Sequence, residues 1–135
     1  MTEPSYPSPS AVSVEDQAIH WDAQLSYGTY LQLESLLSLQ QPRSTAHDEL
    51  MFIVVHQAAE LWLKLAIAEL AAAMTEIGRG NPGPAFKMLS RVSRIQVQLT
   101  ESWAVLSTLT PADYSAFRQS LGQSSGFQSY QYRQL

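Results

Sequence analysis

The longest apolar pattern in the chain runs from His47 to Ile77 and contains neither glycine nor proline. It is rich in Ala, Leu, Glu and Met, which are strong helix formers. Ser44 and Thr45 precede it as candidate N-caps, and Gly78 follows as a helix-ending residue. On a helical wheel, four polar residues fall in one narrow stripe, namely Glu49, Gln57, Glu60 and Lys64. Because the remaining surface is mostly apolar, this helix is expected to be central, with neighbours on several sides.

A second long helix is predicted after the turn-forming sequence Gly78–Pro84. Apolar residues recur at helical spacing over about Ala85–Leu109, and Pro84 is placed as the first residue, where its missing N–H costs nothing. Since only a short loop joins the two long helices, they are expected to pack antiparallel.

Shorter elements flank this pair. Leucines at a rough helical period predict a helix within Leu25–Gln40. Thr110 as N-cap, with Pro111 first and an acid at the third position, predicts a short helix that ends at Leu121 before Gly122. No strand pattern occurs. The predicted fold class is therefore all-α, a helical bundle of two long antiparallel helices plus shorter helices.

The domain organisation is simple. Residues 1–13 are rich in proline and serine and predict a disordered tail. The rest, 14–135, is expected to form one helical domain, because 135 residues usually make a single core. Near its end, Ser124 and Ser125 are candidate N-caps of one more helix.

Charge and composition exclude several classes of function. The net charge of −4, without a basic stripe, argues against nucleic-acid binding. No uncharged run of 18 apolar residues occurs, so no membrane span is expected. The first residues have neither the basic nor the apolar part of a signal peptide. Cysteine is absent, which rules out disulfides and thiolate metal sites and makes the cytoplasm the simplest location.

Two pairs of residues at helical spacing are candidate chemistry. Phe52 and His56 are four apart, at the edge between the polar stripe and the apolar surface. With Glu60 four residues on, His56 reads most simply as half of a surface ion pair. The functional interpretation is a neutral imidazole in an aromatic pocket, able to bond a substrate N–H.

Tyr114 and Arg118 repeat this spacing on the short helix. They indicate either a solvent-facing stack of tyrosine and arginine or a clamp, in which the guanidinium and the phenol bind one carboxylate. Tyr27 and Tyr30 point the same way on a helix. They are interpreted as ordinary packing or as a lid over a ligand or a neighbouring subunit.

Three strings carry a resemblance to a known family: YGTYLQLESLL, HDELMFIVVHQAAELWLKL and FKMLSRVSRIQVQLTESWAVLSTLTPADYSAFRQSLGQSSGFQSYQYR. In this order they resemble the amino-terminal part of tryptophan 2,3-dioxygenase, from about Leu25 to the end of the chain. The patterns FxxxHQxxELWxKL and SSGFQSxQ within them are long and specific to that family.

The resemblance implies a histidine-ligated haem dioxygenase fold and a homotetramer that opens the indole ring of L-tryptophan with O2 to give N-formyl-L-kynurenine. His56 matches the catalytic histidine that bonds the indole N–H, and Arg118 matches the residue that pairs with the substrate carboxylate, with Tyr114 as its helper. The remaining substrate-binding residues implied are the FIVVH wall, Phe52, Ile53, Val54 and Val55, and three residues that complete a neighbour's pocket, Tyr27, Tyr30 and Leu31.

The chain departs from the family in one respect. The family's proximal haem-ligating histidine lies in a second half without a counterpart here, and neither His20 nor His47 is assigned as a ligand. The chain is therefore expected to be incomplete, no metal ligand is assigned in it, and haem b is expected only together with that second half. Two other functions stay open: a related histidine-ligated haem oxygenase acting on another indole, and a non-catalytic helical association module.

Overall fold

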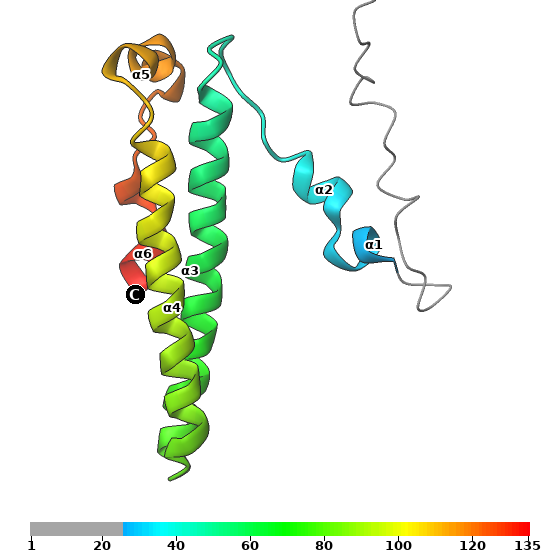
Figure 1. Ribbon diagram of the computed structural model, residues 1–135, viewed down its shortest axis with the longest axis vertical. Coiled ribbons are helices and arrows are strands. Elements are labelled where there is room, and N and C mark those ends of the chain that lie inside the picture. Colours follow the sequence, from blue (N-terminus) through cyan, green and yellow to red (C-terminus); the bar gives the residue numbers. More distant parts are fainter. Residues whose placement is uncertain (1–25) are drawn as a thin grey trace, which may run out of the picture. The chain divides into compact units, whose positions relative to one another are not determined.

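The chain divides into two compact units, Met1–Leu39 and Gln40–Leu135, and the computed structural model describes residues 26–135 (Figure 1). The predicted tail at 1–13 and His20 lie outside the described residues. Within 26–135 every regular element is a helix, which confirms the all-α fold class.

The first unit contains two short helices in place of the single leucine-rich helix predicted for this region. They are α1 (Tyr27–Leu31) and α2 (Leu33–Leu37). Gln32 separates them because its backbone is left-handed, with φ of 51°, a conformation that breaks a right-handed helix. Ser26 caps α1 by accepting a hydrogen bond from the Thr29 N–H at 3.1 Å. Neither helix has a buried residue.

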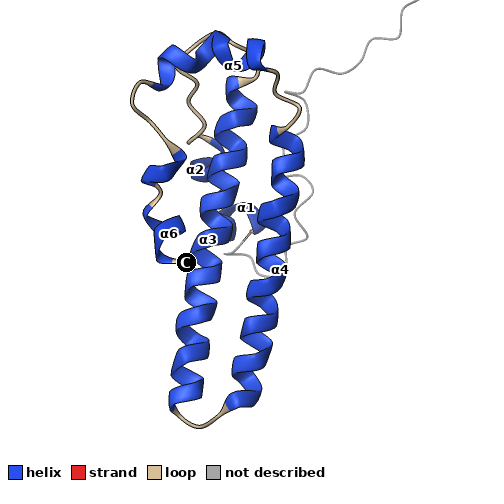
Figure 2. Ribbon diagram, turned by 90° about the vertical axis from the view of Figure 1, so that its left-hand side faces the viewer, coloured by secondary structure: helices blue, strands red, loops and turns tan. Residues whose placement is uncertain are grey.

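The second unit is built on two long helices, α3 (Glu49–Gly78) and α4 (Pro82–Leu106). They run side by side in opposite directions and are joined by a tight turn, as predicted (Figure 2). Their shared core contains Ala66, Ala73 and Ala85, all almost completely buried. Small side chains let the two backbones approach closely, and Leu63, Val92 and Ile95 fill the remaining interface.

The turn between the long helices differs in register from the prediction. Gly80, not Gly78, has the positive φ that ends α3. Its N–H donates to the Ile77 carbonyl at 3.0 Å and the Asn81 N–H donates to the Glu76 carbonyl at 2.9 Å, the Schellman pattern. Helix α4 then begins two residues earlier than predicted, with Pro82 in the first position.

Glu49 belongs to the polar stripe of α3 but is not exposed to solvent. Its side chain is only 1% exposed, because the preceding chain folds over it. The carboxylate accepts hydrogen bonds from the backbone N–H groups of Arg43 and Ser44, both at 2.8 Å, and from the Ser44 hydroxyl. Ser44 and Thr45 therefore do not cap α3, and the N-cap residue is Asp48. The Arg43 N–H, followed by the Ser44 hydroxyl, lowers the pKa of the Glu49 carboxyl below its ordinary value of 4.5.

The chain beyond α4 crosses the end of the helix pair and returns along it. Helix α5 (Pro111–Arg118) starts with the predicted capping box, in which Thr110 and Asp113 bond reciprocally. It continues as the 3₁₀ turn η3 (Gln119–Leu121) to Gly122, which has a φ of 56° and ends the element as predicted. A second turn, η4 (Gly126–Gln128), precedes α6 (Tyr130–Gln134), which lies beside α3 (Figure 2).

Within the described residues α3 is not surrounded by neighbours, although the sequence predicts a central helix. Large apolar side chains stay exposed along it, namely Leu50, Val54, Leu61, Trp62, Leu65, Met74 and Ile77. By length and composition alone α3 would also pass as a membrane span, contrary to expectation, but the core helix of a soluble protein passes the same test.

We predict that Glu49→Gln lowers stability at pH 7, because an amide places N–H groups against the N–H groups of Arg43 and Ser44. The pKa of Glu49 is depressed on folding, so its stabilisation is present above pH 4.5 and is lost as the pH falls through the folded value. The measurement is the urea midpoint at pH 7 and pH 3. The variant should lose less stability on acidification than the native chain, whereas the exposed control Glu34→Gln should match the native chain. Equal acid sensitivity of native chain and Glu49→Gln would contradict the role of Glu49.

The exposed apolar surface of α3 predicts self-association, since contiguous apolar patches are removed from water by contact between molecules. Sedimentation velocity should show a mass that rises with protein concentration. Leu61→Lys should weaken this association. Ala71→Lys, which adds the same charge on the polar side of α3, should not. A monomer at all concentrations would count against the prediction.

Candidate functional site

A cleft of about 460 Å³ opens in the second unit where α3, α5 and the segment after α5 meet. Helix α3 forms its floor, α5 forms one wall, and the segment after η3 forms a roof. The lining residues are Phe52, His56, Glu60, Tyr114, Arg118, Leu121, Ser124, Ser125, Gly126, Gln128 and Ser129.

The floor is a row of three side chains, Phe52, His56 and Glu60, that recur every four residues and so share one face of α3. The rings of Phe52 and His56 lie 4.2 Å apart between centroids, tilted by 37°. The His56 Nδ1 atom lies 2.7 Å from the Phe52 carbonyl oxygen. Because a carbonyl only accepts, Nδ1 donates, which leaves Nε2 of the neutral ring as an acceptor.

The orientation of this pair is fixed by aromatic neighbours from other helices. Phe117 of α5 is fully buried and meets Phe52 edge-on at 5.4 Å. Trp103 of α4 meets His56 edge-on at 6.4 Å, with the two ring planes at 90°. Such contacts hold a ring at a defined angle. The imidazole is therefore held in place before any ligand arrives.

The surface ion pair considered for His56 is not formed. Its expected partner, Glu60, accepts hydrogen bonds from Gln131 instead. His56 is half-buried and faces a cleft lined by aromatic and polar groups. This environment fits the functional interpretation of the histidine.

The wall carries the second predicted pair. The Arg118 guanidinium lies 5.8 Å from the centre of the Tyr114 ring, a stacking geometry for a cation on an aromatic face. Tyr114 also packs edge-on against Phe117 at 5.5 Å. No acidic side chain among residues 26–135 forms an ion pair with Arg118. The stack and the clamp are thus compatible, since the stacked guanidinium still lines the cleft.

The roof contributes hydroxyl and backbone groups, and among its residues the sequence singles out only Ser124 and Ser125, as helix caps. Ser125 does cap an element, the turn η4, by accepting from the Phe127 N–H at 3.3 Å. Ser129, which was not predicted as a cap, caps α6 through the Tyr132 N–H at 3.1 Å. The SSGFQS string was thus a usable signal for the roof of the cleft.

Other predicted site residues do not line this cleft. Ile53, Val54 and Val55 lie on other faces of the turn between Phe52 and His56. Tyr27, Tyr30 and Leu31 belong to α1 of the first unit, where all three are exposed. Their proposed contribution to a neighbouring subunit's pocket stays a prediction.

Sequence reasoning also missed residues in and around the cleft. Glu60 was interpreted as part of the polar stripe, although its spacing from His56 already placed it on the same face. Trp103 falls within the apolar pattern of Ala85–Leu109 and carries no other signal in the sequence. Its contact with His56 joins residues far apart in the chain and has no local signal.

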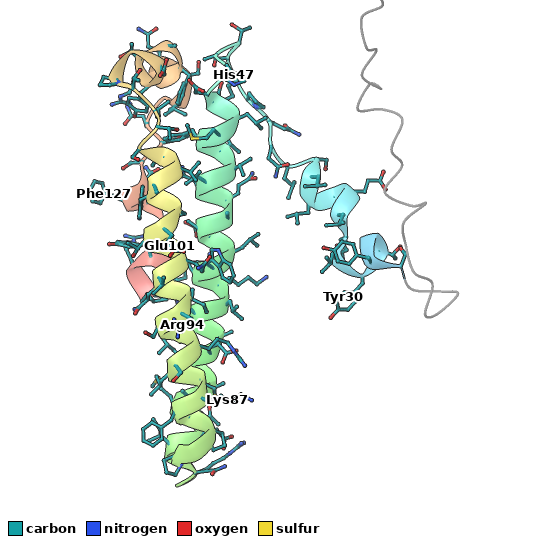
Figure 3. The ribbon with its side chains drawn as sticks, viewed as in Figure 1. Tyr30, His47, Lys87, Arg94, Glu101 and Phe127 are labelled. Carbon is teal, nitrogen blue, oxygen red and sulfur yellow. The ribbon has the colours of Figure 1, made fainter. Side chains whose placement is uncertain are left out.

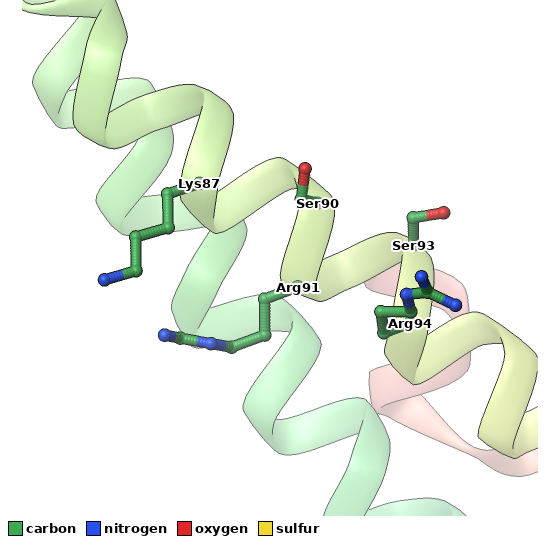
Figure 4. A pocket seen from close by; sticks show the side chains of 5 residues that line it. All are labelled: Lys87, Ser90, Arg91, Ser93 and Arg94. Atoms are coloured by element: carbon green, nitrogen blue, oxygen red, sulfur yellow. The ribbon is translucent and has the colours of Figure 1, made fainter.

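A second hollow, of about 580 Å³, lies along α4 and is lined by Lys87, Ser90, Arg91, Ser93 and Arg94 (Figure 4). All five side chains come from one exposed helical face, so no opposing wall encloses a ligand. Arg91 is already paired with Glu69 at 2.6 Å. The part of the chain that the structure describes contains no group of three or more His, Cys, Asp or Glu suited to a metal ion.

Comparisons with known proteins agree with the sequence motifs. Residues 13–135 match the family model described as Tryptophan 2,3-dioxygenase. The chain is 54% identical over 128 residues to tryptophan 2,3-dioxygenase of Bradyrhizobium sp. (strain ORS 278), covering 95% of this chain and 46% of that protein. It is 56% identical over 124 residues to the Bacillus anthracis protein of the same name, covering 90% and 44%. The chain thus spans about half the length of the curated relatives it matches.

Proposed function

Because the chain belongs to the tryptophan 2,3-dioxygenase family, we propose that it takes part in the haem-dependent opening of the indole ring of L-tryptophan by O2, which yields N-formyl-L-kynurenine. The observation that supports this most directly is the cleft itself. It combines an imidazole acceptor, an aromatic face and a guanidinium without a carboxylate partner among residues 26–135.

The floor suits an indole. Nε2 of His56 is the free acceptor of a neutral ring, and the indole N–H is a donor only. Phe52 packs one turn earlier and offers an aromatic surface to the indole plane. His56 then orients the ring through its N–H, and Phe52 sets the plane in which the reacting carbon lies.

The wall suits the amino-acid end of the substrate. A guanidinium presents parallel N–H groups that match a carboxylate in two hydrogen bonds. The Tyr114 phenol lies beside Arg118 and adds one more donor on the same side of the cleft. A substrate with an indole at one end and a carboxylate at the other would bridge floor and wall.

The described residues account for the substrate-binding side of a haem pocket but not for the ligand of the iron. When bound, haem b supplies the redox chemistry that activates O2. The described residues have the chemistry of a substrate wall, but no residue among them is assigned as an iron ligand. Their part is binding and orientation: His56 holds the indole N–H, Phe52 the ring plane, and Arg118 the carboxylate.

Further properties of the family are proposed on the same basis. We infer a homotetramer in the cytoplasm, with the substrate-binding residues Tyr27, Tyr30 and Leu31 completing a neighbouring subunit's pocket. The exposure of all three side chains supports this assignment. Exposed apolar residues on α3 support assembly of some kind.

Arg118→Lys tests the carboxylate clamp in a haem-loaded, full-length form of the enzyme. Lysine cannot make the paired contact, so the transition-state stabilisation that kcat/KM for L-tryptophan measures should fall. The expected loss is that of a charge-assisted bond, about 1.5–3 kcal/mol. Tryptamine has no carboxylate and should be nearly indifferent. Arg94→Lys, on the exposed face of α4, is the matched control and should change neither substrate. Equal losses for the two substrates would show that Arg118 does not bind the carboxylate.

His56→Ala tests the floor of the cleft. Turnover of L-tryptophan should fall by one to a few orders of magnitude, about the range of a lost orienting or acid–base group. Haem content should remain normal, because the assigned role of His56 is to bond substrate. His47→Ala provides the control at the other described histidine. Loss of haem in His56→Ala would make His56 an iron ligand, and unchanged turnover would return it to a surface histidine.

A further inference from the structure

The roof of the cleft belongs to a segment that the hydrophobic core does not hold. This roof segment comprises residues 122–135, and none of them is buried. Phe127 is 89% exposed and points outward, while Tyr130 and Tyr132 are each 67% exposed (Figure 3). Apolar burial, the usual anchor of a surface segment, therefore contributes little to its position.

Hydrogen bonds within the roof segment fix its shape but not its height above α3. Ser125 and Gln128 bond reciprocally around η4, and Ser129 caps α6. The Gln134 amide donates to the Tyr130 hydroxyl at 3.1 Å within α6. Each of these bonds joins residues at most four positions apart.

One side chain ties the segment to the long helices. The Gln131 Nε2 group donates to the Glu60 carbonyl oxygen at 2.9 Å and to the Glu60 carboxylate at 2.7 Å. Among the described residues these are the only hydrogen bonds between the roof segment and the α3–α4 pair. They join positions 71 residues apart, and one acceptor is charged, which makes that bond stronger than a neutral one.

The anchor point lies in the floor of the cleft. Glu60 is one helical turn beyond His56 on the same face and lines the cleft itself. The distance between floor and roof is therefore set where Gln131 meets α3. Arg118 and the serines of the roof face the same space from the opposite side.

We propose that Gln131 is a positioning residue, which latches the roof segment onto Glu60 and thereby sets the distance of Ser124–Ser129 from His56 and Arg118. This inference rests on the proposed function only for the identity of the ligand. The contact between Gln131 and Glu60 holds the polar residues Ser124–Ser129 over the amino-acid end of a bound tryptophan. Without this contact, these residues move away from the cleft.

Hydrogen exchange in the 135-residue chain tests the latch without ligand or haem. Gln131→Leu keeps the size of the side chain and removes both donors. Because a helix of five residues is marginal without tertiary contact, the amides of Gln128, Tyr132 and Arg133 should then exchange at least about tenfold faster, whereas exchange in α3 and α4 should stay native. Gln134→Leu, on the same helix but bonded only to Tyr130, should leave exchange of the Gln128 amide native. Native exchange in Gln131→Leu overturns the proposal.

Swapping the side chains of Glu60 and Gln131 distinguishes loss of their specific contact from general damage to α6. Gln131→Glu sets two carboxylates against each other and should open the roof segment as Gln131→Leu does. The double variant Glu60→Gln with Gln131→Glu restores an amide donor opposite a carboxylate. It should recover part of the protection of the Gln128 and Tyr132 amides, because a carboxylate at position 131 cannot donate to the backbone carbonyl of residue 60. Failure to recover any protection would overturn the assigned contact.

The consequence for binding is tested in the haem-loaded enzyme. Gln131→Leu should raise KM for L-tryptophan more than KM for tryptamine, with kcat less affected, because the roof faces the amino-acid end. A faster-exchanging roof with native KM values would overturn the positioning role. Because the exchange measurement requires no substrate, its outcome stays separate from a failure of the tryptophan assignment, which His56→Ala and Arg118→Lys address.

Discussion

The close approach of α3 and α4 is the constraint on which the rest of the second unit depends. Ala66, Ala73 and Ala85 have side chains small enough to bring the two backbones together. A larger residue at any of these positions would push the helices apart and force neighbouring side chains out of their rotamers. Since α3 carries the floor of the cleft and α4 carries Trp103, their separation also determines the surroundings of His56.

Local spacing was sufficient to find the two residue pairs on the floor and the wall of the candidate site. Phe52 and His56 share a face because a four-residue step is close to one helical turn, and Tyr114 and Arg118 follow the same rule. The capping box at Thr110 was likewise readable, because its partners are three residues apart. These features depend only on helix geometry, which the sequence expresses directly.

Features that depend on chain reversal were not predictable in this way. A helical wheel places Glu49 with the polar residues, but it contains no information about the segment before the helix, which folds over the carboxylate. The break at Gln32 was hidden for a related reason, because leucines continue the pattern on both sides of it. Glu60 and Gln131 are separated by 71 residues, so neither residue marks the other in the sequence.

The edge-on contact between Trp103 and His56 has a practical consequence. Trp103 is 56% exposed, so one part of its indole lies in water while its ring meets the imidazole. The emission of an indole depends on polarity and on nearby quenching groups, and an imidazolium quenches more strongly than a neutral imidazole. The protein therefore carries its own optical probe at the floor of the cleft. With both Trp21 and Trp62 replaced by phenylalanine, a spectroscopist could follow the charge state of His56 through the light emitted by its neighbour.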